Sequence, residues 1–313
     1  MGETSRARHL SVGDGIIFSG DGRSTLPVPQ AQVGDSVVPA HWMPSNDALR
    51  ECLALQEEAA PRSLLLRLFG ADPLSRDARR SYSGALAEIA LADSLAALGP
   101  DWTVVHSLPL GGTLPEQHLA IDHLVIGPAG IFTITLHSHA GQDIWVGERT
   151  FLVDDERLGH LLVAEESALA VSGLLETALA VGGTAVDLLV TPCIVVDSPA
   201  TMRIRQRTGR IQVITARDFT AWLASLPRLF SPAVVDTLSG VALQSSTWPA
   251  RPAVQSRDVH HQRDDFDRLL LQIASARLRR LIWTGLGVIA SYAAVIVNSS
   301  GQSALELLSA LGG

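Results

Sequence analysis

The chain has 313 residues, of which 47% are hydrophobic and 18% are charged, so it is long and apolar enough to bury a core in about two domains. Its 24 basic and 32 acidic residues give a net charge of −8, which excludes a generally basic nucleic-acid coat but leaves room for a local basic site. The sequence contains no lysine, so no mechanism that requires a lysine can operate. Two cysteines, Cys52 and Cys193, are too few for a disulfide framework or a zinc cluster.

The first 80 residues are interpreted as an N-terminal extension of unknown role, with one helix expected from Asn46 to Glu58. From Ser81 the apolar spacing becomes regular, and helical or alternating patterns follow one another with Gly and Pro turns between them. The order α-β-β-β-α-β predicts a mixed α/β layer fold over residues 81–243. The expected helices cover residues 83–98, 161–181, 216–226 and 232–243, and the expected strands cover 102–110, 119–127, 130–137, 187–196 and 211–215, with a further hairpin turning at Gly147.

The C-terminal part predicts a membrane anchor. Residues 244–265 read as a linker, and residues 266–298 as a juxtamembrane segment and a transmembrane helix, followed by a short tail. The stretch from Leu281 to Val297 carries no charge and approaches the about 20 residues needed to cross a bilayer. The alternative interpretation of this apolar stretch is a helix buried in a protein core. Three arginines stand directly before this stretch: Arg277, Arg279 and Arg280. They predict a single-pass protein of the cell membrane whose main domain is cytoplasmic. Their side chains are expected to face anionic lipids.

Two carboxylates stand out within the regular part. Glu88 lies in an otherwise apolar helical segment, and Asp122 lies between Ile121 and His123 in an apolar strand. Burial of a lone carboxylate is costly unless the group is paired or binds a metal. Each one alone is compatible with surface exposure or a structural ion pair, so the interest lies in the two together.

These residues resemble the nuclease-related domain (NERD) family of the restriction-endonuclease-like superfamily. In that family a glycine-to-glutamate helix segment precedes a strand reading I-D-H, a turn, G-V-F, and a strand ending in E-x-K. The resemblance covers residues 81–196 and implies a mixed sheet flanked by helices, with Glu88 and Asp122 holding Mg²⁺ or Mn²⁺ for hydrolysis of DNA. The matching residues here are Gly84, Glu88, Ile121, Asp122, His123, Gly127, Gly130, Phe132 and Trp145 to Gly147.

The resemblance fails at the E-x-K positions, which here read Thr135, Leu136 and His137. A threonine supplies no negative ligand for a hard cation, which prefers carboxylate oxygens. His137 is a candidate general base near neutral pH, but it cannot reproduce the fixed charge of a lysine. Glu88 and Asp122 alone are expected to hold a metal only weakly.

His137 and His139 alternate along the end of a strand and should share one face. With Asp122 they would offer imidazole and carboxylate ligands for Zn²⁺ or Mn²⁺, whereas the simpler alternative is two solvated histidines. His123 is expected to face away from Asp122 and to serve in packing.

One basic cluster remains, in the segment MRIRQRTGR. Its guanidinium groups would suit a nucleic-acid backbone, although a solvated loop is the equally simple alternative. The residues are Arg203, Arg205, Arg207 and Arg210.

Two hypotheses for function follow. The first is a weak or inactive nuclease that serves as a membrane-anchored binding module for nucleic acid or for a protein partner. The second is an active metal-dependent DNA phosphodiesterase that uses Glu88, Asp122 and His137.

Overall fold

The computed structural model describes residues 16–17, 46–111, 119–205, 209–249 and 256–311. The chain divides into two compact units, one formed by residues 1–49 and 80–259 and the other by residues 50–79 and 260–313. The first unit contains the sheets and the predicted α/β domain. The second is helical and joins two segments that are distant in the sequence.

Five strands form the central sheet of the first unit, in the order β11-β9-β4-β3-β2. The strands β2, β3 and β4 are antiparallel neighbours, whereas β4 pairs with β9 and β9 with β11 in parallel. Only Pro128 and Ala129 separate β3 from β4, and Gly130 closes the turn with φ +136°, a conformation that glycine adopts easily. The bounds are β2 (Thr103–Gly111), β3 (Leu119–Gly127), β4 (Gly130–Ser138), β9 (Val190–Asp197) and β11 (Gln212–Thr215).

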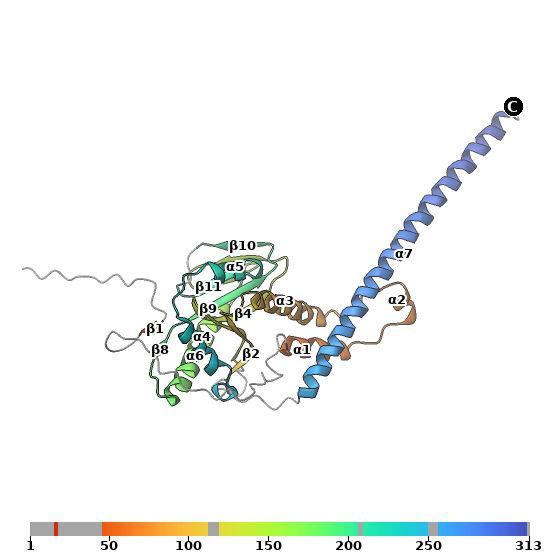
Figure 1. Cartoon of the computed structure of the whole chain (residues 1–313). Coiled ribbons are helices and arrows are strands. Elements are labelled where there is room, and N and C mark those ends of the chain that lie inside the picture. Colours follow the sequence, from red (N-terminus) through yellow and green to blue (C-terminus); the bar gives the residue numbers. More distant parts are fainter. Residues whose placement is uncertain (1–15, 18–45, 112–118, 206–208, 250–255, 312–313) are drawn as a thin grey trace, which may run out of the picture. The chain divides into compact units, whose positions relative to one another are not determined.

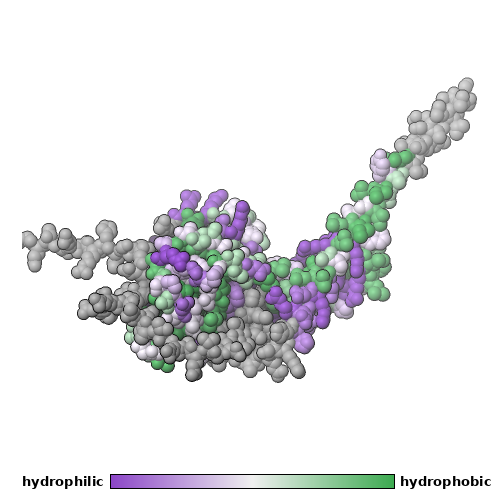
Figure 2. Space-filling view, viewed as in Figure 1, coloured by the Kyte–Doolittle hydropathy of each residue, from purple (hydrophilic) through white to green (hydrophobic). Residues whose placement is uncertain are grey.

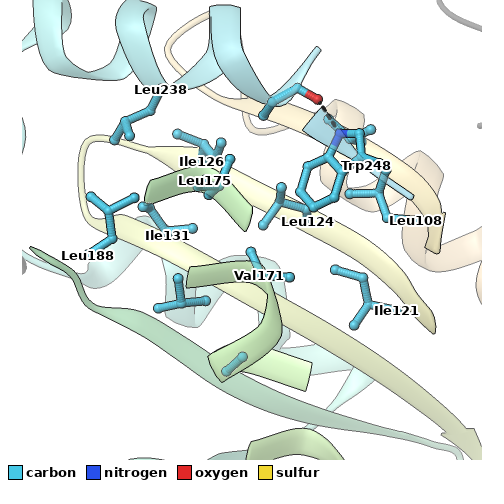
Figure 3. Close-up of a cluster of buried hydrophobic side chains, with 14 of the residues drawn as sticks. Leu108, Ile121, Leu124, Ile126, Ile131, Val171, Leu175, Leu188, Leu238 and Trp248 are labelled. Carbon is cyan, nitrogen blue, oxygen red and sulfur yellow. Dashed lines mark hydrogen bonds between the residues drawn. The ribbon is translucent and has the colours of Figure 1, made fainter. Parts of the chain in front are cut away.

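Helices cover both faces of this sheet (Figure 1). On one face, α3 (Ala78–Ala96) and α5 (Ala216–Ser225) contribute apolar side chains that pack with Phe132 and Ile134 of β4. On the other face, α4 (His160–Val181) and α6 (Pro232–Ala242) pack against β2, β3 and the start of β4. Figure 3 shows this second layer, including Trp248, whose indole N–H donates to the carbonyl of Ala242 at 2.8 Å. The mixed α/β fold with helices on both sides of a mixed sheet is thus confirmed.

A smaller sheet follows the central strand β4 in the chain. Its order is β10-β5-β6-β7, with β5–β6 and β6–β7 antiparallel and β10 parallel to β5. The predicted hairpin at Gly147 is confirmed by the β5–β6 pair. The strands are β5 (Asp143–Val146), β6 (Phe151–Val153), β7 (Glu156–Leu158) and β10 (Thr201–Ile204). The short pair β1 (Ile16–Ile17) and β8 (Asp187–Leu188), and the 3-10 turn η2 (Ser245–Thr247), complete the unit.

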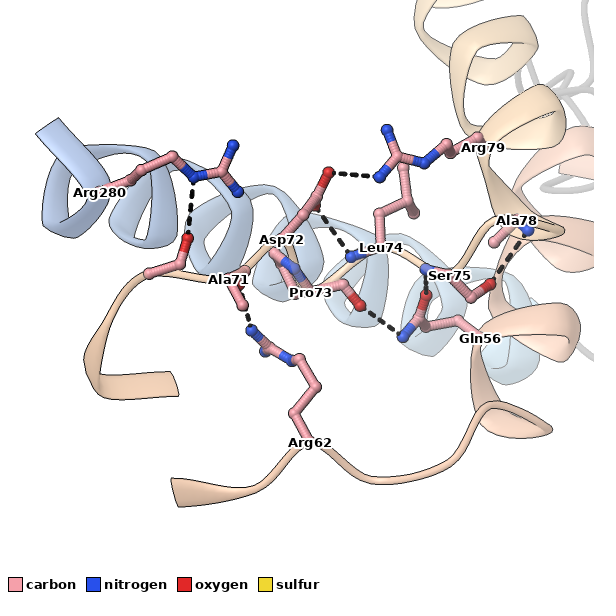
Figure 4. A network of polar contacts seen from close by, with 11 residues as sticks. Gln56, Arg62, Ala71, Asp72, Pro73, Leu74, Ser75, Ala78, Arg79 and Arg280 are labelled. Carbon is pink, nitrogen blue, oxygen red and sulfur yellow. Dashed lines mark hydrogen bonds and ion pairs between the residues drawn. The ribbon is translucent and has the colours of Figure 1, made fainter. Parts of the chain in front are cut away.

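The second unit joins residues 50–79 to the long helix α7 (Ser256–Leu311). It includes the end of α1 (Asn46–Glu57) and the short helix α2 (Leu64–Leu68). Polar contacts hold the connecting segment, as Figure 4 shows: Arg62 donates to the carbonyl of Ala71 at 2.8 Å, and Arg280 donates to that of Gly70 at 3.3 Å. Gly70 permits this close approach, because a Cβ there would lie 2.4 Å from the carbonyl oxygen of Ala276.

The surface of α7 is apolar beyond its arginines. Figure 2 shows hydrophobic side chains along this helix, and Leu281, Ile289 and Tyr292 are 70%, 66% and 69% exposed. The indole N–H of Trp283 donates to the carbonyl of Leu68 at 3.0 Å, and its ring packs on Phe69.

The predicted transmembrane helix is not supported. Over the residues that the structure describes, no helix combines the length and the apolar character needed to cross a membrane.

Candidate functional site

The four residues at the nuclease-type positions lie on three elements of the first unit. Glu88 lies on α3 and is buried, with 8% of its surface exposed. Asp122 lies near the middle of β3, and Thr135 and His137 lie toward the end of the neighbouring strand β4. The register pairs His123 with Ile134 across these strands, so Asp122 and Thr135 are neighbours on adjacent strands.

The carboxylate of Asp122 is engaged by the main chain. Its Oδ2 accepts a hydrogen bond from the backbone N–H of Leu136 at 2.5 Å. Burial raises the pKa of Asp122, the hydrogen bond from Leu136 lowers it, and the negative charge of Asp47 raises it, so that the pKa lies at about 6. A carboxyl group with this pKa is still mostly ionised at pH 7, so its protonation does not by itself prevent the binding of a cation.

Thr135 does not replace the missing carboxylate. Its side chain is 8% exposed, and its Oγ1 donates to the carbonyl of Cys193 at 3.5 Å. A neutral hydroxyl group also supplies no negative charge for a hard cation. The donor set at these positions therefore does not fit Mg²⁺, which needs several well-placed oxygen ligands at about 2.0–2.1 Å.

A second group of side chains gathers at the end of β4. His137, His139 and His160 each offer a ligand atom, and these three atoms all lie within 4.8 Å of one another. The rings of His137 and His160 stack with their centroids 3.6 Å apart, and the Nε2 atoms of His139 and His160 lie 3.2 Å apart. Phe151 of β6 meets the ring of His160 edge-on at 5.0 Å.

Two of these imidazoles are neutral at physiological pH. Burial, together with the proximity of His160 and His139, lowers the pKa of His137 to about 3. Burial and the proximity of His139 lower the pKa of His160 to about 4. The neutral form of imidazole is the one that binds metals.

The sequence predicted only part of this cluster. His137 and His139 come together as expected, but Asp122 bonds to Leu136 in place of joining them. His160, the first residue of α4, was missed. The only signal in the sequence was a histidine directly before a predicted helix. The strands β5, β6 and β7, which lie between β4 and α4 in the chain, bring His160 back to the end of β4. His123 is completely buried, as its expected packing role requires, with its Nδ1 2.7 Å from that of His106.

The arginine segment lies on and after β10. Arg203, Arg205 and Arg210 are exposed, while Arg207 lies outside the described residues. Arg203 lines a shallow hollow together with Asp143, Asp154 and Asp155. Arg210 lines another hollow, beside Glu165 and Asp187. The role of these arginines in binding nucleic acid remains a prediction.

The comparisons with known proteins agree with the resemblance. Residues 83–194 match the family model of the nuclease-related domain, NERD. No curated protein and no solved structure matched the chain. The matched region runs from α3 to β9 and includes both the nuclease-type positions and the three clustered histidines.

Proposed function

We propose that this chain, which carries a nuclease-related domain over residues 83–194, binds nucleic acid and has little or no Mg²⁺-dependent nuclease activity. One observation carries the proposal. The strand that supplies a carboxylate and a lysine in the resembling family supplies Thr135 and His137 here, and the neighbouring Asp122 is bonded to the main chain of the same strand. The domain keeps the layered α/β scaffold without the complete set of groups for hydrolysis.

The chemistry of phosphodiester cleavage explains why both replacements matter. A divalent metal polarises the phosphate and lowers the pKa of the attacking water, and a fixed positive charge stabilises the charge that develops in the transition state. Thr135 removes a negative ligand. His137 has a pKa lowered to about 3 by burial and by the neighbouring histidines, so it carries no charge near neutral pH. The two defects should compound.

Exposed arginines support a binding role. Arg203 and Arg205 lie within and directly after the edge strand β10, and Arg210 follows in the same segment. Arginine forms paired hydrogen bonds with phosphate oxygens, and phosphate contacts fix the position of a protein on a duplex without reading its sequence. The overall acidic charge of the chain would oppose non-specific coating, so we assign binding to this local segment.

We also propose that α7 attaches the protein to a cell membrane, with the main domain on the cytoplasmic side. Support comes from the exposed apolar side chains of this helix, among them Leu281, Val288 and Ile289. Three exposed arginines precede them and would face anionic lipid headgroups: Arg277, Arg279 and Arg280.

Restoration of the missing groups tests the proposal on activity. The double substitution Thr135→Glu with His137→Lys should create or raise Mg²⁺-dependent cleavage of DNA, because Glu88 and Asp122 still supply two carboxylates. A further Asp122→Ala should abolish that gain. Wild-type cleavage that depends on Glu88, Asp122 and His137 would instead support the alternative, an active metal-dependent phosphodiesterase.

A further inference from the structure

We propose that His137, His139 and His160 form a binding site for Zn²⁺. The three side chains converge at the end of β4 and the start of α4, and one ligand atom from each lies within 4.8 Å of the other two. The site shares His137 with the nuclease-type positions, but its other two ligands, His139 and His160, have no part in the chemistry that the nuclease resemblance implies.

The spacing of two ligand atoms already suits a tetrahedral metal. Zn–N bonds of about 2.0–2.1 Å in tetrahedral geometry place two ligand nitrogens about 3.3 Å apart. The Nε2 atoms of His139 and His160 are 3.2 Å apart. His137 stacks directly on His160, and one of its ring nitrogens lies within 4.8 Å of the ligand atoms of the other two histidines.

A chain of hydrogen bonds orients His139 toward this centre. The carboxylate of Asp154 accepts from Nε2 of Gln142 at 2.9 Å, so the amide oxygen of Gln142 faces His139. That oxygen lies 3.1 Å from Nδ1 of His139 and must accept a proton from it. The proton therefore sits on Nδ1, and the lone pair of Nε2 points toward His160. Metal-binding histidines are commonly oriented in this way by a carboxylate or carbonyl partner.

Backbone hydrogen bonds hold the loop that carries His139. The second carboxylate oxygen of Asp154 accepts from the N–H of Asp143 at 2.9 Å. The carbonyl of Gln142 accepts from the N–H of Ala200 at 2.8 Å, and the N–H of Gly141 donates to the carbonyl of Ser198 at 3.0 Å. The loop that carries His139 is thus joined to the end of β9, while the fully buried Phe151 forms a wall beside His160.

The ligand type selects the metal. Three imidazole ligands suit Zn²⁺ and other late transition metals, whereas Mg²⁺ and Ca²⁺ prefer oxygen ligands. Three protein ligands leave a fourth tetrahedral position for water or another small ligand, as in open zinc sites. Each of the three histidines is partly buried, and we expect a water molecule to complete the coordination of the metal.

Direct titration with Zn²⁺ tests the site. The sample is full-length protein without a histidine tag, treated with a chelator to remove bound metal. Calorimetry follows its titration with Zn²⁺. Absorption spectroscopy with Co²⁺ then probes for a tetrahedral nitrogen site. The wild type should bind one Zn²⁺ per chain and give a visible Co²⁺ absorption band. His139→Gln and His160→Gln should each lose both signals. The matched controls His261→Gln, an exposed histidine on α7, and Asp122→Asn should keep them.

Gln142→Leu provides a variant that leaves all three ligands in place. It removes the acceptor that orients His139, and the affinity for Zn²⁺ should fall by about 10- to 100-fold, with an unchanged circular dichroism spectrum. Absence of binding by the wild type would overturn the proposal. Binding that persists at full strength in His139→Gln and His160→Gln, or that is lost equally in His261→Gln, would overturn it as well.

Discussion

The carboxylate of Asp122 on β3 accepts a 2.5 Å hydrogen bond from the backbone N–H of Leu136 on β4. A residue that resembles a catalytic metal ligand therefore serves first as a link between two strands of the central sheet. Asp122 thus has a structural role that does not depend on a metal.

Asp122→Ala should destabilise the fold. The substitution leaves the N–H of Leu136 without its acceptor, and an unsatisfied buried donor costs about 1–3 kcal/mol. Asp122→Asn keeps an acceptor oxygen and should cost less. Urea unfolding of the two variants beside the wild type measures the difference, and equal stability of Asp122→Ala and the wild type would refute the linking role.

The buried histidines should make the protein less stable in acid. Burial lowers the pKa of His106 to about 4, while the unfolded side chain titrates near 6.5. Between these values the unfolded state binds more protons, so the free energy of unfolding falls as the pH falls from 6.5 toward 4. Asp122 has its pKa raised to about 6 and acts in the opposite direction over much of that range.

The difference between the wild type and His106→Gln isolates the histidine, because Asp122 is present in both. The variant should lose stability less steeply over this pH range in chemical unfolding measurements. Parallel curves for the two proteins would show that His106 keeps an ordinary pKa in the fold.

Two glycines offer a matched test of packing. A Cβ added at Gly127 would lie 2.1 Å from the ring of Trp102, whereas nothing lies within 4 Å of the same position at Gly84 on α3. Gly127→Ala should destabilise the domain by about 1–3 kcal/mol through overpacking. Gly84→Ala should stabilise it by about 0.5–1 kcal/mol, since alanine favours the helix. Thermal or urea unfolding distinguishes the two, and a harmless Gly127→Ala would contradict the described packing of Trp102.

The arginine segment should neutralise phosphates of bound DNA. Arg203→Ala with Arg205→Ala should flatten the dependence of log K on log salt for duplex DNA by about 0.9 for each phosphate that is no longer neutralised. Arg228→Ala serves as the control, because Arg228 is exposed and pairs with Asp101 on the same unit. An unchanged salt slope in the double variant would assign Arg203 and Arg205 to a solvated strand edge.

Apolar side chains of α7 should govern membrane attachment. Val288→Asp with Ile289→Asp places two charges on positions that are 65% and 66% exposed, so the fold should tolerate them. Full-length wild-type protein should sediment with anionic lipid vesicles, and so should the control variant Leu162→Asp on α4. The double variant should remain in the supernatant, as should a protein truncated after Asp265. Wild-type protein that stays in the supernatant would contradict the attachment.

Local patterns predicted most of the central fold. The apolar runs on either side of Pro128-Ala129 predicted β3 and β4, because a short turn between two such runs is typical of a hairpin. The helix α4 was expected from Leu161 and begins at His160. The parallel pairing of β4 with β9 joins segments about 60 residues apart, and no local period encodes such a pairing.

The histidine cluster was less predictable, because it too depends on contacts between segments that are distant in the sequence. Sequence alternation places His137 beside His139, but the approach of His160 depends on how the small sheet returns the chain to β4. Likewise, the hydrogen bond between Asp122 and Leu136 depends on strand register, and the approach of Gly70 to α7 joins segments more than 200 residues apart. The sequence patterns also did not predict helix α2, and they did not predict that α7 begins as early as Ser256.

The most direct test of the proposed function is the incubation of purified wild-type protein with linear and supercoiled duplex DNA in the presence of Mg²⁺ or Mn²⁺, with binding and cleavage followed in the same samples. We expect salt-dependent binding of DNA that stays intact. Efficient cleavage that disappears in Asp122→Ala, or the absence of any binding at low salt, would contradict the proposal.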